Sequence, residues 1–164
     1  MCTTQLMISL VISKLDYCNC LFNNMSSENF HRIQLVQNHA ARMIKKAPKT
    51  ASATSILKEL HWLPIKQRVS YEIAFIVFKC LYIENFTSYL KDIITIYKPP
   101  RSLRSAGQIL LNKPFKKLST FGQMCFHFAA PEVWNSLPFE LRCCESLPVL
   151  KSNLKTHFFK ILIP

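Results

Sequence analysis

Residues 57–82, LKELHWLPIKQRVSYEIAFIVFKCLY, decide the fold. After a Trp-Leu-Pro corner, apolar residues recur at the spacing of one helical face. They are Ile65, Val69, Ile73, Ile76, Val77, Cys80 and Leu81. Pro64 suits the first turn of a helix, because the N–H that proline lacks has no intrahelical partner there. A helix that is apolar around most of its circumference must be covered by neighbours. The sequence therefore predicts a long central helix at about 65–83 inside a helical bundle.

Composition and periodicity predict a mainly α fold for the rest of the chain. The 164 residues are 49% hydrophobic and include two glycines, too few for phosphate-cradling loops or a turn-rich all-β fold. Further helices are expected at residues 3–22, 27–46, 55–62, 89–96 and 146–162, and on either side of Pro131. A small β-hairpin is expected near 108–118, with residues 109–111 pairing with 115–118.

These elements are expected to form one domain made of three segments. Residues 1–96 form a first helical segment, and residues 97–120 form a basic, proline-containing loop or hairpin. Residues 121–164 form a C-terminal helical segment that packs on the first. No stretch reaches the roughly 20 apolar residues that span a bilayer, and the apolar run near the start lacks the basic residues of a signal peptide.

Charge is the strongest signal of function. Lys and Arg number 21 against 9 Asp and Glu, a net charge of +12 that favours nucleic acid over an acidic membrane surface. No acid occurs between Glu28 and Glu59, and a first group of candidate phosphate-binding residues lies there. These are Arg32, Arg42, Lys45, Lys46 and Lys49. A merely solvated helix face explains them equally well.

A second basic group lies between Asp92 and Glu132, which again enclose no acid. Its candidate residues are Arg101, Arg104, Lys113, Lys116 and Lys117. Basic residues on a loop, together with Ser, Thr and aromatic residues, are typical of phosphate contacts. We favour this group over the first, because a loop can adapt its shape to a nucleic-acid backbone.

The cysteines and histidines do not predict a metal site, a cofactor or a catalytic residue. The seven cysteines contain no CxxC pair, which favours reduced thiols in the nucleus or cytoplasm. Cys18 and Cys20 with His31 or His39 match no common zinc spacing. Cys125 and His127 stand at i and i+2, so on a helix their side chains point apart. We expect neither an independent enzyme nor a small-molecule substrate.

Three pieces of the sequence, taken together, resemble a known family. They are SKLDYCNCLF (13–22) with RIQLVQNHAARMI (32–44), LKELHWLPIKQR (57–68) and PEVWNSLPFELR (131–142), with RSLRS (101–105) between the last two. In this order they resemble the C-terminal, thumb-side region of LINE-type reverse transcriptases, and the jockey-like group in particular. These are the RNA-directed DNA polymerases of non-LTR retrotransposons. The resemblance covers essentially the whole chain.

The resemblance implies a role without catalysis. In such polymerases the palm, with its paired catalytic aspartates, lies upstream of the matching region, whereas the only aspartates here are Asp16 and Asp92. The resemblance implies that the region grips template RNA, an RNA–DNA hybrid or target DNA during reverse transcription. If the palm is missing from this chain, residues 6–21 should expose large apolar side chains that once faced it.

Alternative interpretations stay open beside nucleic-acid binding. The chain is either a nucleic-acid-binding remnant of such a polymerase or a structural remnant with no activity of its own. Convergence of the two basic groups on one face would favour binding, and their dispersal would favour the structural remnant. Binding to a membrane surface would require the final helix to undock and expose its apolar stripe.

Overall fold

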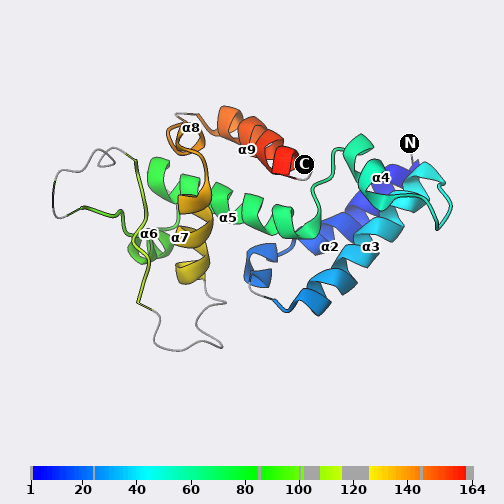
Figure 1. Cartoon of the computed structure of the whole chain (residues 1–164), viewed down its shortest axis with the longest axis horizontal. Helices are drawn as coiled ribbons and strands as arrows, with labels where there is room; N and C mark the ends of the chain where they lie inside the picture. The colour runs from blue at the N-terminus through cyan, green and yellow to red at the C-terminus, as the bar shows by residue number, and fades with distance from the viewer. Residues whose placement is uncertain are drawn as a thin grey trace. The chain divides into compact units, whose positions relative to one another are not determined.

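A computed structural model describes residues 2–23, 25–84, 86–99, 101, 108–115, 126–144 and 146–161. Most of these residues are helical, so the predicted mainly α class is confirmed (Figure 1). The chain divides into two compact units, Met1–Val69 and Ser70–Pro164. The division falls within helix α5 (Ile65–Tyr82). The prediction of three segments in one domain stays a prediction.

The first unit begins with a chain of short helical turns. Helix α1 (Cys2–Met7) leads into a π-helical stretch, η1 (Ile8–Ile12), and then into α2 (Ser13–Asp16). The helix predicted at 3–22 is interrupted after α2, because Cys18 adopts a left-handed conformation with φ 52°. A 3₁₀ turn, η2 (Asn19–Phe22), follows. Left-handed conformations of residues other than glycine are uncommon, and helical periodicity alone does not reveal them.

Helix α3 (Ser27–Lys45) has clear signals at both ends. The Ser26 hydroxyl caps its first turn by accepting a hydrogen bond from the Asn29 N–H at 3.3 Å. Lys46 ends the helix in a left-handed conformation and donates its N–H to the Arg42 and Met43 carbonyls. A short linker then leads to α4 (Ala53–Glu59). Ala41 of α3 packs with Ile56 and Leu57 of α4 in a small apolar core.

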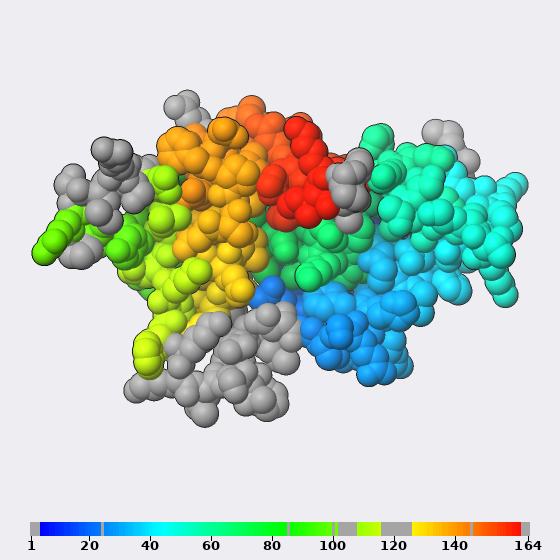
Figure 2. All heavy atoms as spheres, viewed as in Figure 1, coloured from blue at the N-terminus to red at the C-terminus, as the bar shows by residue number. Residues whose placement is uncertain are grey.

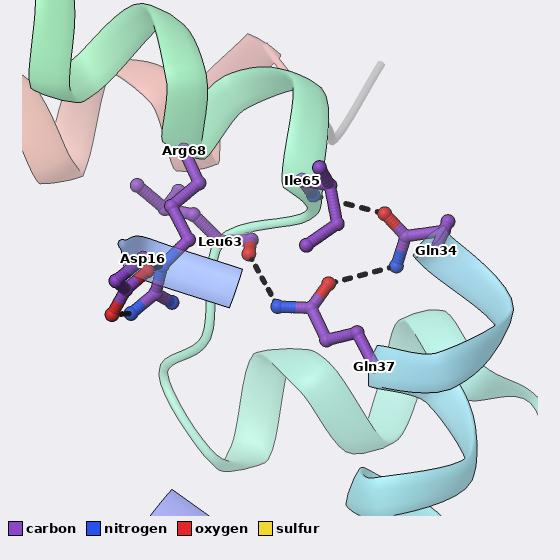
Figure 3. A network of polar contacts seen from close by, with 6 residues as sticks. All are labelled: Asp16, Gln34, Gln37, Leu63, Ile65 and Arg68. Carbon is purple, nitrogen blue, oxygen red and sulfur yellow. Dashed lines mark hydrogen bonds and ion pairs between the residues drawn. The ribbon is translucent and has the colours of Figure 1, made fainter. Parts of the chain in front are cut away.

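Two glutamines of α3 hold the corner that precedes α5 (Figure 3). The Gln37 side chain, which is 0% exposed, donates from Nε2 to the Leu63 carbonyl at 2.9 Å. Gln34 donates to Gln37 Oε1 at 2.8 Å, and its own Oε1 accepts from the Ile65 N–H at 2.9 Å. Both backbone groups at the corner are therefore satisfied by side chains from α3.

A salt bridge ties α5 to α2 (Figure 3). The Arg68 guanidinium donates through Nε and Nη2 to both carboxylate oxygens of Asp16, with 2.6 Å between Nη2 and Oδ2. A bidentate pair of this kind fixes orientation as well as distance. Together with the glutamine contacts it positions α2, α3 and the first turn of α5 relative to one another.

Large apolar side chains between residues 6 and 21 are exposed, which confirms the expectation of an uncovered apolar surface there. They are Leu6, Ile8, Leu10, Tyr17 and Leu21. Ile12 of the same stretch is buried. One face of this stretch is therefore packed, and another is presented to solvent.

The second unit contains the remainder of α5 with α6 (Ser88–Ile93), α7 (Phe126–Ser136), α8 (Phe139–Arg142) and α9 (Leu147–Ile161). Trp134 of α7 and the predicted stripe residues Leu150, Leu154 and Phe158 of α9 are buried. In Figure 2 the yellow, orange and red atoms of α7–α9 lie against the green atoms of α5. No described helix is both long enough and apolar enough to cross a membrane.

The described part of residues 108–118 forms no hairpin. Leu111 forms an isolated antiparallel bridge with Ile96, and the described residues contain no strand. The Tyr97 N–H donates to the Leu110 carbonyl at 2.7 Å, and the Asn112 N–H donates to the Thr95 carbonyl at 2.9 Å. Residues 93–96 are Ile-Ile-Thr-Ile, a β-branched run that favours extended backbone, so α6 ends earlier than the predicted residue 96. Residues 116–118, the expected partners, lie outside the described residues.

Replacing Gln37 with Met should destabilise the first unit. The near-isosteric side chain keeps the volume but leaves the Leu63 carbonyl buried without its donor, which costs about 1–3 kcal/mol. Urea denaturation followed by circular dichroism measures the change. Gln5→Met, at an exposed position of α1, is the control and should leave the midpoint unchanged. Equal stability of the Gln37→Met variant and the parent would contradict the role assigned to Gln37.

Cys80 should react with iodoacetamide more slowly than Cys18, Cys20, Cys143 and Cys144. Burial raises the pKa of its thiol, and the nearby Lys91 ammonium offsets this only in part, so little reactive thiolate forms near pH 8. Cys18 is exposed and serves as the internal reference. Peptide mass spectrometry over a time course gives both rates. Equally fast labelling of the two thiols in the folded chain would be inconsistent with a buried Cys80.

Candidate nucleic-acid interface

The first basic group lies on α3 and the linker to α4, and two of its members make internal contacts. Arg42 donates from Nε and Nη2 to the Ala51 carbonyl at 3.2 and 3.1 Å, so it holds the linker. Lys45 forms an ion pair with Glu59, with 2.8 Å between Nζ and Oε2. Arg32 is exposed and stands in the N-terminal half of α3. The group is therefore partly structural.

Arg42, Lys46 and Lys49 nevertheless gather at one place. With His39, Met43 and Ala47 they line a pocket of about 460 Å³ at the C-terminal end of α3, which we call the basic pocket. Within the described part of the chain, none of its three cationic side chains has a carboxylate at ion-pair distance. Such a pocket can accept a phosphate or a carboxylate group.

The second basic group is described only in part. Arg101 and Lys113 are exposed, whereas Arg104, Lys116 and Lys117 lie outside the described residues. Two exposed aromatic side chains stand close to them in the sequence, Tyr97 and Phe115, and the Phe115 side chain is 86% exposed. Aromatic rings beside cations are the usual elements of single-strand binding, because every base has a face that can stack.

The backbone next to these residues is held in place by α7 and α8. Asn135 accepts from the Leu111 N–H and donates to the Leu111 carbonyl, both at 2.9 Å. The Trp134 indole donates to the Ile109 carbonyl at 2.9 Å, and Arg142 donates from Nη1 to the Gln108 carbonyl at 2.6 Å. We call these three side chains the clamp. Because the bridge also joins residues 95–97 to 110–112, the backbone that precedes Arg101 and the backbone that precedes Lys113 share one fixed base.

Arg142 belongs to the clamp although its charge suggested no such role. It is 5% exposed, and its Nε also donates to the Leu137 carbonyl at 3.2 Å. Among the described residues no carboxylate forms a salt bridge with it, so backbone carbonyls solvate the buried guanidinium. Arg142 is the last residue of the PEVWNSLPFELR piece that carries the resemblance. The spacing of that piece does not reveal that Arg142 holds the backbone at Gln108.

The described residues do not assemble a metal-binding site. No group of three or more His, Cys, Asp or Glu side chains that could hold a metal ion occurs among them. Asp16 is engaged by Arg68, and His127 Nδ1 lies 3.0 Å from the Ile93 carbonyl oxygen. Cys125 lies outside the described residues, so its geometry with His127 stays a prediction.

Comparison of the chain with protein-family models, curated proteins and solved structures finds no match. The first basic group belongs to the unit Met1–Val69, and the second belongs to Ser70–Pro164. The sequence reasoning missed His39 in the basic pocket, and it missed Tyr97 and Phe115 as exposed rings beside the loop.

Replacing Asn135 with Ala should release Leu111 from the clamp. Both backbone groups of Leu111 lose their partner, so its amide should exchange with solvent about 5- to 150-fold faster, equivalent to about 1–3 kcal/mol. Asn135→Asp retains an acceptor for the Leu111 N–H and should show a smaller effect. Ser136→Ala, at an exposed neighbour, is the matched control. Hydrogen exchange measured by NMR tests this, and unchanged protection of Leu111 in Asn135→Ala would exclude the clamp.

Proposed function

We propose that the chain is a non-catalytic nucleic-acid-binding region derived from the C-terminal, thumb-side part of a LINE-type reverse transcriptase. Its ligand is the backbone of template RNA, an RNA–DNA hybrid or target DNA. The observation that carries the proposal is the clamped basic loop, where Arg101 and Lys113 are exposed and the exposed rings of Tyr97 and Phe115 lie close to them in the sequence. Its site of action would be the nucleus or the cytoplasm.

The loop has the chemistry that a flexible polyanion requires. Cations attract phosphates at any sequence, and stacked rings add affinity for unpaired bases without reading their identity. The fixed base provided by Trp134, Asn135 and Arg142 supports such a site, because it reduces the ordering entropy that binding must overcome.

The positions of the residues that carry the resemblance also support the proposal. Asp16 of the first piece pairs with Arg68 of the second, and the WLPI corner is held by Gln34 and Gln37. The third piece supplies the clamp. These residues build a scaffold, which fits a region that positions nucleic acid and leaves catalysis to other parts of a polymerase. In that polymerase, we further propose, α5 is the central helix of the region.

An inactive structural remnant is the alternative. It is favoured by the internal contacts of Arg42 with Ala51 and of Lys45 with Glu59, because cations engaged in the fold are less available to phosphates. Under this alternative the remaining basic residues form a solvated surface.

Fluorescence anisotropy with single-stranded RNA, an RNA–DNA hybrid and duplex DNA over a salt series tests the proposal. Affinity should fall log-linearly with salt because bound phosphates release counterions. The five loop cations are Arg101, Arg104, Lys113, Lys116 and Lys117. Replacing them with Gln should reduce the steepness of the plot of log affinity against log salt concentration. For single strands the expected reduction is about 0.7 for each phosphate that is no longer neutralised. Phe115→Ala should weaken single-strand binding by about 1–3 kcal/mol without changing the slope.

The control is Lys155→Gln combined with Lys160→Gln, which removes charge from exposed positions of α9. The salt dependence of its affinity should stay close to that of the parent, whereas the loop variant should show a clearly weaker salt dependence. A folded chain that binds none of the three nucleic acids would leave only the structural remnant. Equal effects of the loop variant and the control would indicate attraction by net charge alone.

A further inference from the structure

An apolar groove runs along the first unit beside the basic pocket. Met7 and Val11 form one side, and α3 supplies Leu35, Val36, His39, Ala40 and Met43. The groove has a volume of about 500 Å³. The Val36 and Met43 side chains are 50% and 57% exposed, whereas Ala40 is buried at 4%. An apolar surface between two helical segments is therefore in contact with solvent.

The groove continues into the basic pocket, since His39 and Met43 line both. Toward the C-terminal end of α3 the lining changes from apolar side chains to the cationic side chains of Arg42, Lys46 and Lys49. The combined surface therefore has an apolar stretch and a cationic end.

We propose that this surface docks an amphipathic helix of a partner protein, with the apolar stripe of the helix in the groove and acidic side chains at one of its ends in the basic pocket. The lining residues follow helical spacing on both sides, at 7 and 11 and at 36, 40 and 43, which leaves a channel for a third helix. From Leu35 to Lys46 the α3 axis rises about 17 Å, so the docked helix needs about three turns.

Charge complementarity predicts that the docked helix places acidic side chains in the basic pocket. It also argues against a second copy of this chain as the partner. The basic pocket has no acidic residue in its lining, and carboxylates can pair with its guanidinium and ammonium groups. Two copies of a chain with a net charge of +12 repel each other. A partner whose docking helix is negatively charged is attracted instead.

A nucleic acid and a membrane fit the groove less well. Nucleobases carry polar edges, and burying them against Met7, Val11 and Val36 would leave their hydrogen-bonding groups without partners. A bilayer surface contacts protruding apolar side chains, whereas the floor of this groove at Ala40 lies between two helical segments. The inference goes beyond the proposed function and does not depend on it.

Fluorescein-labelled peptides of about 18 residues provide the probe. Each has a stripe of leucines at i, i+3, i+4 and i+7, with four glutamates at either its N-terminal or its C-terminal end. Matched peptides carry four lysines in place of the glutamates. Anisotropy titrations with the full chain should show that one of the two acidic peptides binds. Its lysine counterpart should bind at least about tenfold more weakly, and the difference should shrink as salt is added.

Two variants of the chain separate the groove from the basic pocket. Val36→Gln places a polar amide in the groove and should weaken the acidic peptide about tenfold. Lys46→Asn with Lys49→Gln removes two charges, and asparagine tolerates the left-handed conformation of residue 46. This double variant should lose most of the preference for glutamate over lysine. Leu21→Gln and Lys14→Gln, at exposed positions outside both linings, are the matched controls.

Several results would overturn the proposal. Neither acidic peptide binds the folded chain, or the acidic peptide that binds the parent binds Val36→Gln equally tightly. Alternatively, Val36→Gln weakens binding to RNA or to anionic vesicles while no peptide binds, which would assign the groove to that ligand. Failure here is distinguishable from failure of the proposed function, because the RNA titrations depend on Phe115 and the loop cations whereas the peptide titrations depend on Val36.

Discussion

The contact of Gln34 and Gln37 with the backbone at Leu63 and Ile65 is the constraint on which the first unit depends. A Trp-Leu-Pro corner brings a carbonyl and the first N–H of a helix into the interior, where an unsatisfied backbone group costs about 1–3 kcal/mol. Proline has no N–H to offer there. Because α3 supplies both partners, the corner lies against α3, and this fixes where α5 begins. The Asp16–Arg68 pair then orients α2 on the same helix.

The second unit uses the same physical solution for irregular backbone. Residues 108–111 are neither helix nor sheet, and the clamp side chains Trp134, Asn135 and Arg142 hydrogen-bond to their carbonyls and to one N–H. Apolar burial holds the helices together, but polar side chains decide where the connecting segments lie. The pieces of sequence that carry the family resemblance are therefore largely those that position backbone.

Periodicity predicted α3, α5 and α9 closely, because each has an apolar stripe and recognisable end signals. It did not predict the left-handed residue Cys18 or the bridge between Ile96 and Leu111, which depend on partners distant in sequence. Charge counting located both basic groups, but it could not show that Arg42 and Lys45 are engaged by Ala51 and Glu59. Side-chain partners are a tertiary property, so sequence spacing alone leaves the roles of individual cations undecided.

The two basic surfaces differ in what surrounds their cations, and this difference matters more than the net charge of +12. Exposed aromatic rings lie near Arg101 and Lys113 in the sequence, whereas the pocket at Arg42, Lys46 and Lys49 opens onto aliphatic side chains. Rings can stack on bases, but an aliphatic wall offers a base no stacking face and no hydrogen bond. A helix, whose polar backbone is already satisfied internally, loses nothing when its apolar stripe meets such a wall. Under both proposals, electrostatic attraction brings a polyanion to the surface, and the neighbouring uncharged side chains determine which kind of polyanion remains bound.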